Sequence, residues 1–180
     1  MIHPDSLVLD IGCGTGELVF YLSGKANTVI GIDKDQTILK YAQWKKDRLR
    51  IDNVIFLNIN INDTAMFPEY HFDYIVFSLF MHQITINDVD QVIEAVKEGS
   101  RNIILADFNF PLPKNMPGQV ARIVEWLAGG EHYHKFKEYQ KMGGLDYITR
   151  KHQLAINDDL TTGSGVFRVI KASARPNLAD

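Results

Sequence analysis

Short apolar runs alternate with amphipathic stretches along the first 110 residues of the chain. Five runs are short and apolar enough to be buried strands, at residues 7–9, 28–33, 54–57, 72–78 and 102–107. The stretches between them have helical spacing, most clearly where Val89, Val92, Ile93 and Val96 follow an i, i+3, i+4, i+7 pattern. This alternation is typical of βαβ units and predicts an α/β fold with a mostly parallel sheet.

The last 70 residues depart from this alternation. Apolar runs at residues 152–156 and 166–171 flank Asp158-Asp159 and Gly163-Ser164-Gly165. Turn residues between two such runs predict an antiparallel pair of strands. We therefore expect the parallel sheet to end in an antiparallel hairpin, within a single domain that spans residues 1–180.

A helical insert is predicted between the fifth strand and this hairpin, at residues 111–144. Gly129-Gly130 divides it into two pieces, and the first piece has an apolar stripe of Val120, Ile123, Val124 and Leu127. Loops that follow the carboxyl ends of parallel strands border the binding crevice in open α/β sheets. We expect the insert to act as a lid over that crevice.

The turn after the first strand carries the strongest chemical signal. Gly12, Gly14 and Gly16 stand at alternate positions, where the missing Cβ lets the backbone turn tightly and approach a ligand. The predicted helix from residue 17 to 22 would point its free N–H groups toward an anion. Asp33 follows Gly12 by 21 residues, the usual distance to a carboxylate that accepts hydrogen bonds from ribose hydroxyls. A nucleoside that carries an anionic group is the predicted ligand.

The segment Val8-Leu9-Asp10-Ile11-Gly12-Cys13-Gly14-Thr15-Gly16 resembles motif I of the class I S-adenosylmethionine (SAM)-dependent methyltransferases. A dinucleotide-binding turn has glycine or alanine where Glu17 stands, and a carboxylate there would face a pyrophosphate. SAM carries one carboxylate, an ammonium and a sulfonium, which suit the acidic Asp10 better. The resemblance implies a Rossmann-like, doubly wound, seven-stranded sheet and a methyl transfer that releases S-adenosylhomocysteine (SAH).

The resemblance also implies a set of cofactor-binding residues. They are Asp10, Gly12, Cys13, Gly14, Gly16, Asp33, Lys34, Asn60, Ile61 and Ser78. Asn60 stands where this family has an acidic residue beside the adenine amino group, and its carbonyl oxygen can still accept a hydrogen bond. Asp63 takes that role if the register shifts. Lys34 either lies over the adenine or is solvated, and Ser78 is expected near the sulfonium.

Two residues are candidates for the acceptor side of the reaction. His82 stands where small-molecule members of the family often have a histidine, and it could act as a general base near neutral pH. Packing beneath the cofactor or capping a helix explains the same histidine. Asp107 ends the fifth strand, where it could contact an acceptor or serve only as a turn residue. Methyl transfer depends mostly on alignment, so neither role is required.

No metal site is expected. His132 and His134 are two positions apart on a predicted helix, so their side chains point in nearly opposite directions and cannot chelate one ion. The single cysteine, Cys13, also excludes a cysteine-based metal cluster and an internal disulfide.

Composition and charge narrow the acceptor class. A net charge of −3 gives no electrostatic reason to bind nucleic acid or an anionic membrane. The Asp/Asn-Pro-Pro-aromatic segment of base-methylating enzymes is missing after the fourth strand. The segment that starts at Trp126 loosely resembles the ubiquinone/menaquinone-biosynthesis branch, which implies a small-molecule acceptor. Neither a signal peptide nor an apolar run of ~18 residues is present, and we expect a cytoplasmic protein.

Three alternatives remain open at this stage. An NAD-dependent Rossmann oxidoreductase would share the βαβ unit and Asp33. An aminopropyltransferase would use decarboxylated SAM and more acidic residues around its pocket. A non-catalytic SAM-sensing or partner-binding domain fits the short stretch before motif I, where the family has helices that help cover the substrate. The same short stretch and the apolar stripe predict a homodimer through residues 111–144.

Overall fold

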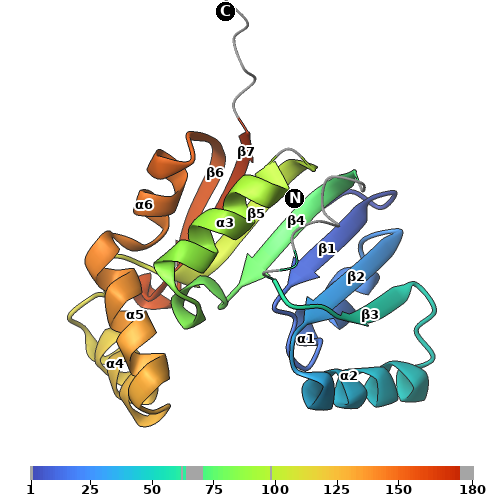
Figure 1. Cartoon of the computed structure of the whole chain (residues 1–180), viewed down its shortest axis with the longest axis horizontal. Helices are drawn as coiled ribbons and strands as arrows, with labels where there is room; N and C mark the ends of the chain where they lie inside the picture. The colour runs from blue at the N-terminus through green and yellow to red at the C-terminus, as the bar shows by residue number, and fades with distance from the viewer. Residues whose placement is uncertain (1, 62, 64–70, 98, 175–180) are drawn as a thin grey trace, which may run out of the picture.

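The computed structural model describes residues 2–61, 63, 71–97 and 99–174. These residues form a seven-stranded sheet with the order β3-β2-β1-β4-β5-β7-β6 (Figure 1). The strands are β1 (Leu7–Ile11), β2 (Thr28–Asp33), β3 (Val54–Asn58), β4 (Phe72–Ser78), β5 (Ser100–Phe108), β6 (Leu154–Thr162) and β7 (Phe167–Ala174). The first five strands pair in parallel, whereas β7 is antiparallel to both β5 and β6. The predicted fold class is confirmed.

Helices cover both faces of the sheet (Figure 1). They are α1 (Glu17–Ser23), α2 (Gln36–Leu49), α3 (Ile86–Lys97), α4 (Met116–Leu127), α5 (Gly130–Met142) and α6 (Gly144–Lys151). Side chains alternate along each strand, so Leu9 and Ile75 pack in the core with α3, while Val8 and Val76 pack in the core with α1. Strands buried on both faces explain the continuous apolar runs in the sequence.

The chain reverses its direction of travel across the sheet at β1. It adds β2 and β3 on one side of β1, then crosses over and adds β4 on the other side. Such a reversal opens a crevice at the carboxyl ends of the two strands that flank it. This topology places the glycine turn after β1 and the segment after β4 at the same crevice.

The helix α2 has a narrow buried face. Its buried residues are Leu39 and Ala42. Tyr41 is exposed and lies beside Trp44, with the ring centroids 5.7 Å apart. An aromatic pair at i, i+3 thus forms on the solvent side of α2.

The C-terminal hairpin is longer than predicted. Asp158 and Asp159 are paired within β6, next to a register irregularity after Ile156, and the turn is at Gly163–Gly165. Because β6 is an edge strand with mostly exposed side chains, it tolerates two consecutive carboxylates. The helix α6 was not predicted, because the insert was expected to end at residue 144, where α6 begins.

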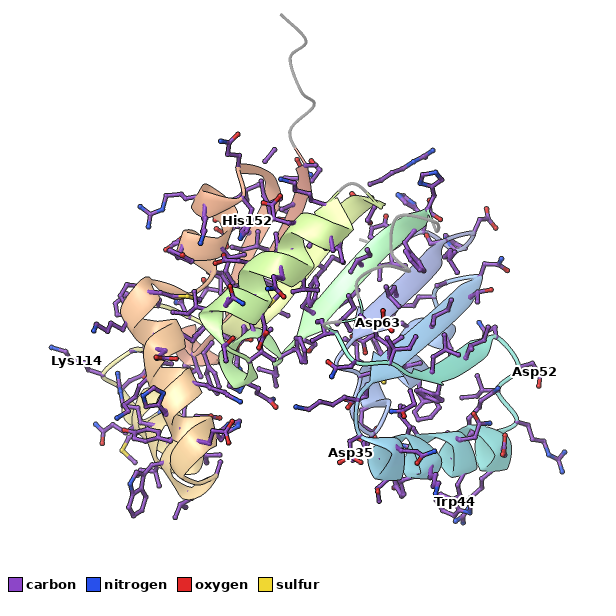
Figure 2. The ribbon with its side chains drawn as sticks, in the orientation of Figure 1. Asp35, Trp44, Asp52, Asp63, Lys114 and His152 are labelled. Carbon is purple, nitrogen blue, oxygen red and sulfur yellow. The ribbon has the colours of Figure 1, made fainter. Side chains whose placement is uncertain are left out.

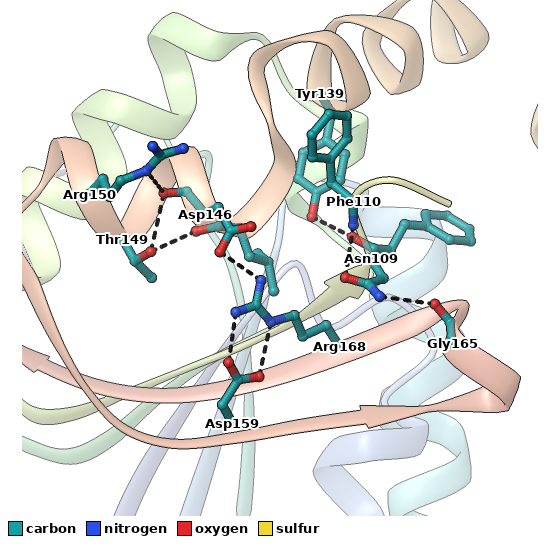
Figure 3. A network of polar contacts seen from close by, with 11 residues as sticks. Asn109, Phe110, Tyr139, Asp146, Thr149, Arg150, Asp159, Gly165 and Arg168 are labelled. Atoms are coloured by element: carbon teal, nitrogen blue, oxygen red, sulfur yellow. Dashed lines mark hydrogen bonds and ion pairs between the residues drawn. The ribbon is translucent and has the colours of Figure 1, made fainter. Parts of the chain in front are cut away.

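Polar contacts attach the helices after β5 to the hairpin (Figure 3). Arg168 on β7 donates to both carboxylate oxygens of Asp159, at 2.9 and 2.6 Å, and to Asp146 on α6 at 2.7 Å. The Tyr139 hydroxyl on α5 donates to the Phe108 carbonyl at the end of β5, at 2.9 Å. The Arg168 bonds thus hold α6 to the hairpin, and the Tyr139 bond holds α5 against the carboxyl end of β5.

A buried histidine joins α3 to the end of α6. His152 lies between Glu94 and Asp90 of α3, with Nδ1 2.7 Å from Glu94 Oε1 and Nε2 2.9 Å from Asp90 Oδ1 (Figure 2). Hydrogen bonds to His152 and Lys97 lower the pKa of Glu94, with the Lys97 bond the larger cause. Within the described residues, no helix is both long and apolar enough to cross a membrane.

Candidate active site

A cavity of about 390 Å³ lies at the carboxyl ends of β1 and β2. Four segments supply its walls: the glycine turn after β1, the end of β2, the residues after β3, and the segment after β4. The lining includes Gly12, Gly14, Asp33, Lys34, Asn60, Ile61, Phe80, Gln83 and Lys135. Lys135 belongs to α5, so the predicted insert does border the cavity.

The glycine turn is shaped by its immediate neighbours. Gly12, Gly14 and Gly16 all have positive φ, a region that other L-residues rarely adopt. A Cβ at Gly12 would lie 2.1 Å from the Phe80 ring, and one at Gly16 would lie 2.7 Å from Phe56. A Cβ at Gly14 would meet nothing within 4 Å. The turn packs on two sides and is open at Gly14, where a ligand can approach the backbone.

Asp33 links the turn to the end of β2. Its Oδ2 accepts a hydrogen bond from the Gly14 N–H and its Oδ1 accepts one from the Asp35 N–H, both at 2.9 Å. Each carboxylate oxygen has a second lone pair for a ligand hydroxyl. Asp33 is therefore both a brace for the glycine turn and an acceptor in the cavity wall.

Asp10 is a buried carboxylate beneath the turn. It is 2% exposed, and its Oδ1 has no hydrogen-bond partner among the described residues. Burial, and to a lesser extent the charge of Asp33, raises the pKa of Asp10 to about 8. Burial and the Asp10 charge also raise the pKa of the Cys13 thiol well above its usual range. A cation close to this pair would relieve the repulsion between the two carboxylates.

The other predicted cofactor residues divide into two groups. Lys34, Asn60 and Ile61 line the cavity together with Asp33. Ser78 instead lines a separate apolar cavity with Ile104 and Leu18. The side chains of neighbouring residues in a strand point to opposite faces, so the end of β4 directs Ser78 away from the crevice. The residue that β4 brings to the crevice is Phe80, which sequence reasoning missed.

Leu79, directly before Phe80, has a strained backbone conformation. Leu79 has a φ of +51°, and its N–H donates to the Ala106 carbonyl on β5 at 2.8 Å. The left-handed conformation turns the chain abruptly after β4. The Phe80 ring then lies against Gly12 and nearly parallel to Phe77, with the ring centroids 6.3 Å apart.

The structure brings His82 and Asp107 into contact. His82 lies in a short 3₁₀ helix (Met81–Gln83), and its Nδ1 is 2.7 Å from Asp107 Oδ1. The backbone N–H groups of His82 and Phe108 also donate to the Asp107 carboxylate. His82 and Asp107 are 3% and 1% exposed, and neither lines the cofactor cavity. Asp107 therefore fixes the orientation of a buried imidazole next to the cavity.

Two residues of the insert complete this cluster. Glu125 is on the buried face of α4, and its Oε2 lies 2.7 Å from His132 Nε2 on α5 and 3.9 Å from His82 Nε2. His134 is exposed and pairs with Glu138. Sequence reasoning missed Glu125 because its neighbour Trp126 and the apolar stripe dominate the pattern of α4. Glu125 and His132 are seven residues apart, a spacing that alone does not predict contact across a helix–helix turn.

The residues around the cavity fit a nucleoside with a positively charged group. Asp33 offers acceptors for hydroxyls, Gly14 leaves the backbone accessible, and the partnerless Oδ1 of Asp10 favours a nearby cation. Two phosphates would add charge beside Asp10 and Asp33, which are already repelling one another. The geometry agrees with SAM better than with a dinucleotide.

Comparisons with known proteins point to the same family. Residues 2–144 match a family model described as a methyltransferase domain. A protein of Invertebrate iridescent virus 6 that is named as a methyltransferase is 34% identical over 110 residues, which cover 58% of this chain and 38% of the viral protein. The 23S rRNA (uracil-C5) methyltransferase RlmD of Aliivibrio salmonicida is 36% identical over 62 residues, 34% of this chain and 14% of that protein. The chain thus matches less than half the length of these curated relatives.

A solved structure shares the fold over nearly the whole chain. Magnesium protoporphyrin IX methyltransferase from Synechocystis PCC 6803, solved with bound SAH, superposes with a TM-score of 0.67 at 22% identity. The match covers 96% of this chain and 75% of that one. Since the family model covers most of its length, the chain belongs to the methyltransferase-domain family, and it has the fold and the motif I turn of the class I SAM-dependent methyltransferases.

Proposed function

We propose that this chain transfers the methyl group of SAM to an oxygen, nitrogen or carbon atom of a small-molecule acceptor and releases SAH. The observation that carries the proposal is the open backbone at Gly14 beside the Asp33 carboxylate, at the carboxyl end of β1. Bound SAM supplies an activated methyl group on a sulfonium. The chain then has to hold the cofactor, exclude water and orient the acceptor.

Asp33 is proposed to accept hydrogen bonds from the ribose hydroxyls, while Asn60 and Ile61 border the adenine. Asp10 lies beneath the glycine turn, of which Cys13 is a part, and the ionised form of Asp10 favours the cationic part of the cofactor. Lys34 lies on the exposed rim of the cavity. His82 and Asp107 are proposed to act on the acceptor side, because α5 covers them and borders the cavity.

Charge around the cavity supports a small acceptor rather than RNA. The charged side chains of the lining are Asp33, Asp35, Asp88, Lys34 and Lys135, three acidic against two basic. An RNA substrate brings a phosphate at every nucleotide and is usually met by clustered Lys and Arg. The 62-residue similarity to an rRNA methyltransferase is the observation that favours RNA as the second candidate.

The exposed side of α4 supports a homodimer through the insert. Val120, Ile123, Val124 and Leu127 are each more than half exposed, and Trp126 beside them is 62% exposed. Contiguous apolar surface of this kind commonly marks an interface. A second copy of the chain that packs α4 against α4 would bury it.

Calorimetric titration with SAH, with NAD as the parallel titrant, tests the cofactor. We expect saturable SAH binding and none for NAD. Transfer from methyl-labelled SAM is then measured with a panel of phenols, thiols and amines, and separately with total RNA. Label in a small molecule supports the proposal, whereas label in RNA alone overturns the acceptor class. NAD binding without SAH binding overturns the proposal as a whole.

A further inference from the structure

Three side chains with nitrogen and oxygen donors converge where the insert meets β4 and β5. They are His82 from the 3₁₀ helix, Glu125 from α4 and His132 from the first turn of α5, and one donor atom of each lies within 4.8 Å of the other two. The side chains of His82 and Glu125 are 3% and 8% exposed, and that of His132 is 28% exposed. Two of the three side chains are thus buried, and solvent reaches the cluster at His132.

Glu125 is a charged residue on the buried side of α4. The buried residues of α4 are Gly118, Ala121 and Glu125, while its large apolar side chains are exposed. Burying a carboxylate is costly unless a positive charge compensates it. His132 Nε2 lies 2.7 Å from Glu125 Oε2, but a hydrogen bond from an imidazole adds no charge, whereas a metal ion held between the three side chains would compensate the carboxylate.

The hydrogen bonds of His82 favour the metal ion. Asp107 Oδ1 lies 2.7 Å from His82 Nδ1, and a carboxylate can only accept, so the tautomer with Nδ1–H suits this contact and leaves the Nε2 lone pair for an ion on the side of Glu125. A carboxylate that accepts from the distal N–H of a metal-ligating histidine is the usual outer-shell arrangement in metal sites. Asp107 is itself fixed by two backbone N–H groups, so the imidazole is held in this orientation.

We propose that His82 Nε2, Glu125 Oε2 and His132 Nε2 bind a borderline-soft divalent cation of the Zn²⁺ class, with a fourth position open. Two imidazoles and one carboxylate are a donor set that Zn²⁺ accepts at about 2.0–2.2 Å, which separates tetrahedral ligand atoms by about 3.4 Å. Glu125 Oε2 now lies 2.7 Å from His132 and 3.9 Å from His82. His132, as the most exposed of the three ligands, makes the adjustment.

The position of this site suggests what it does. Phe80, directly before the 3₁₀ helix, and Gln83, its last residue, both line the cofactor cavity, as does Lys135, one turn after His132. The following role rests on the proposed function. An acceptor hydroxyl or thiol at the open position has its pKa lowered, loses its proton to solvent, and forms the new bond to the methyl carbon while the C–S bond electrons stay on sulfur.

Metal binding is tested on the full chain after chelation and buffer exchange. Zn²⁺ is titrated against a chromophoric chelator, and Co²⁺ is added to look for the visible absorption of a tetrahedral site. We expect one ion per chain. Glu125→Gln and His132→Ala should each weaken Zn²⁺ by at least about 100-fold, and Asp107→Asn by the roughly 10–100-fold that loss of an outer-shell partner costs. His134→Ala, two residues along α5, is the matched control and should leave Zn²⁺ affinity unchanged.

SAH binding by each variant is measured in parallel. Retained SAH affinity in Glu125→Gln and His132→Ala shows that the fold and the cofactor site are intact, so a loss of Zn²⁺ then supports the metal site. No saturable Zn²⁺ binding, or equal Zn²⁺ binding in wild type and the Glu125→Gln/His132→Ala double variant, overturns the metal site. Neither result affects the cofactor proposal, which depends on SAH alone.

Discussion

Asp10 carries the largest electrostatic cost of any single carboxylate in the site. It is buried with one oxygen unpaired, and its pKa is raised to about 8 against an ordinary value of 3.8. A carboxyl group with a raised pKa in the folded state destabilises the fold at pH values where the unfolded chain is ionised. This cost is absent below about pH 4, grows as pH rises, and is complete above about pH 8.

Asp10→Asn should therefore stabilise the ligand-free protein at neutral pH. The difference in unfolding free energy between variant and wild type should increase by up to about 1.4 kcal/mol per pH unit between pH 4 and 8. Urea unfolding at several pH values measures it. Asp52→Asn, at an exposed position in the loop before β3 (Figure 2), should leave the pH profile unchanged. A pH-independent difference for Asp10→Asn would contradict the raised pKa.

Asp33→Ala should weaken SAH binding by about 1.5–3 kcal/mol, the range for hydrogen bonds to a charged group. The variant loses the proposed ribose acceptor and also the hydrogen bond that Asp33 accepts from the Gly14 N–H. Asp47→Ala, at an exposed position of α2 outside the cavity lining whose carboxylate accepts a hydrogen bond from Gln43, is the control and should leave SAH affinity unchanged. Unchanged calorimetric affinity in Asp33→Ala would place the ribose elsewhere.

At the residue scale, the sequence predicted what depends on local spacing. Asp33 and the glycine turn belong to one βαβ unit. Because its two strands pair in parallel, the turn after β1 and the end of β2 lie side by side. Phe80 and Glu125 escaped prediction because their positions depend on the left-handed Leu79 and on the angle between α4 and α5. Ser78 was expected in the crevice, but strand alternation directs it to another cavity.

At the element scale, a buried hydrogen bond connects α5 to the end of β5. Tyr139 is 1% exposed and its hydroxyl donates to the Phe108 carbonyl. Tyr139→Phe leaves that buried carbonyl without this donor and should cost about 1–3 kcal/mol of unfolding free energy. Tyr147→Phe removes a half-buried hydroxyl on α6 that contacts Lys151, and should cost much less. Chemical denaturation of both variants checks the difference, and equal losses would contradict the anchoring role of Tyr139.

The predicted elements were accurate where apolar periodicity is strong and inaccurate where it is weak. The strand at residues 28–33 and the helix with Val89, Val92, Ile93 and Val96 are confirmed with their buried faces. The short α6 was missed because Gly143-Gly144 indicates a helix end, and here the same glycines both end α5 and start α6. The second half of β6 is polar and exposed, so its sequence lacks the apolar positions that predict a strand. It can be polar because β6 lies at the edge of the sheet and pairs only with β7.

At the scale of the whole molecule, the apolar side of α4 predicts association. Light scattering at micromolar concentration should give twice the chain mass of 20.5 kDa. Ile123→Asp should return the protein to the monomer mass, because a charge in the interface is buried without a partner. Leu160→Asp, at an exposed apolar position on the edge strand β6, is the control and should remain dimeric. A monomeric wild type would contradict the dimer.

The described residues that line the cofactor cavity from the glycine turn and the strands β2 and β3 all come before residue 62, whereas the insert begins after residue 110. The stretch before residue 62 thus supplies the larger part of the cavity wall, whereas residues 111–144 add Lys135 to that wall and Glu125 and His132 to the proposed metal site. Of the contacts near the ends of the insert, Arg168 binds Asp146, which follows the insert, whereas Tyr139 within the insert donates to the Phe108 carbonyl, a backbone group that any sequence provides. Under the proposed function, a chimera that takes residues 111–144 from a relative should therefore methylate a different acceptor while it still binds SAM.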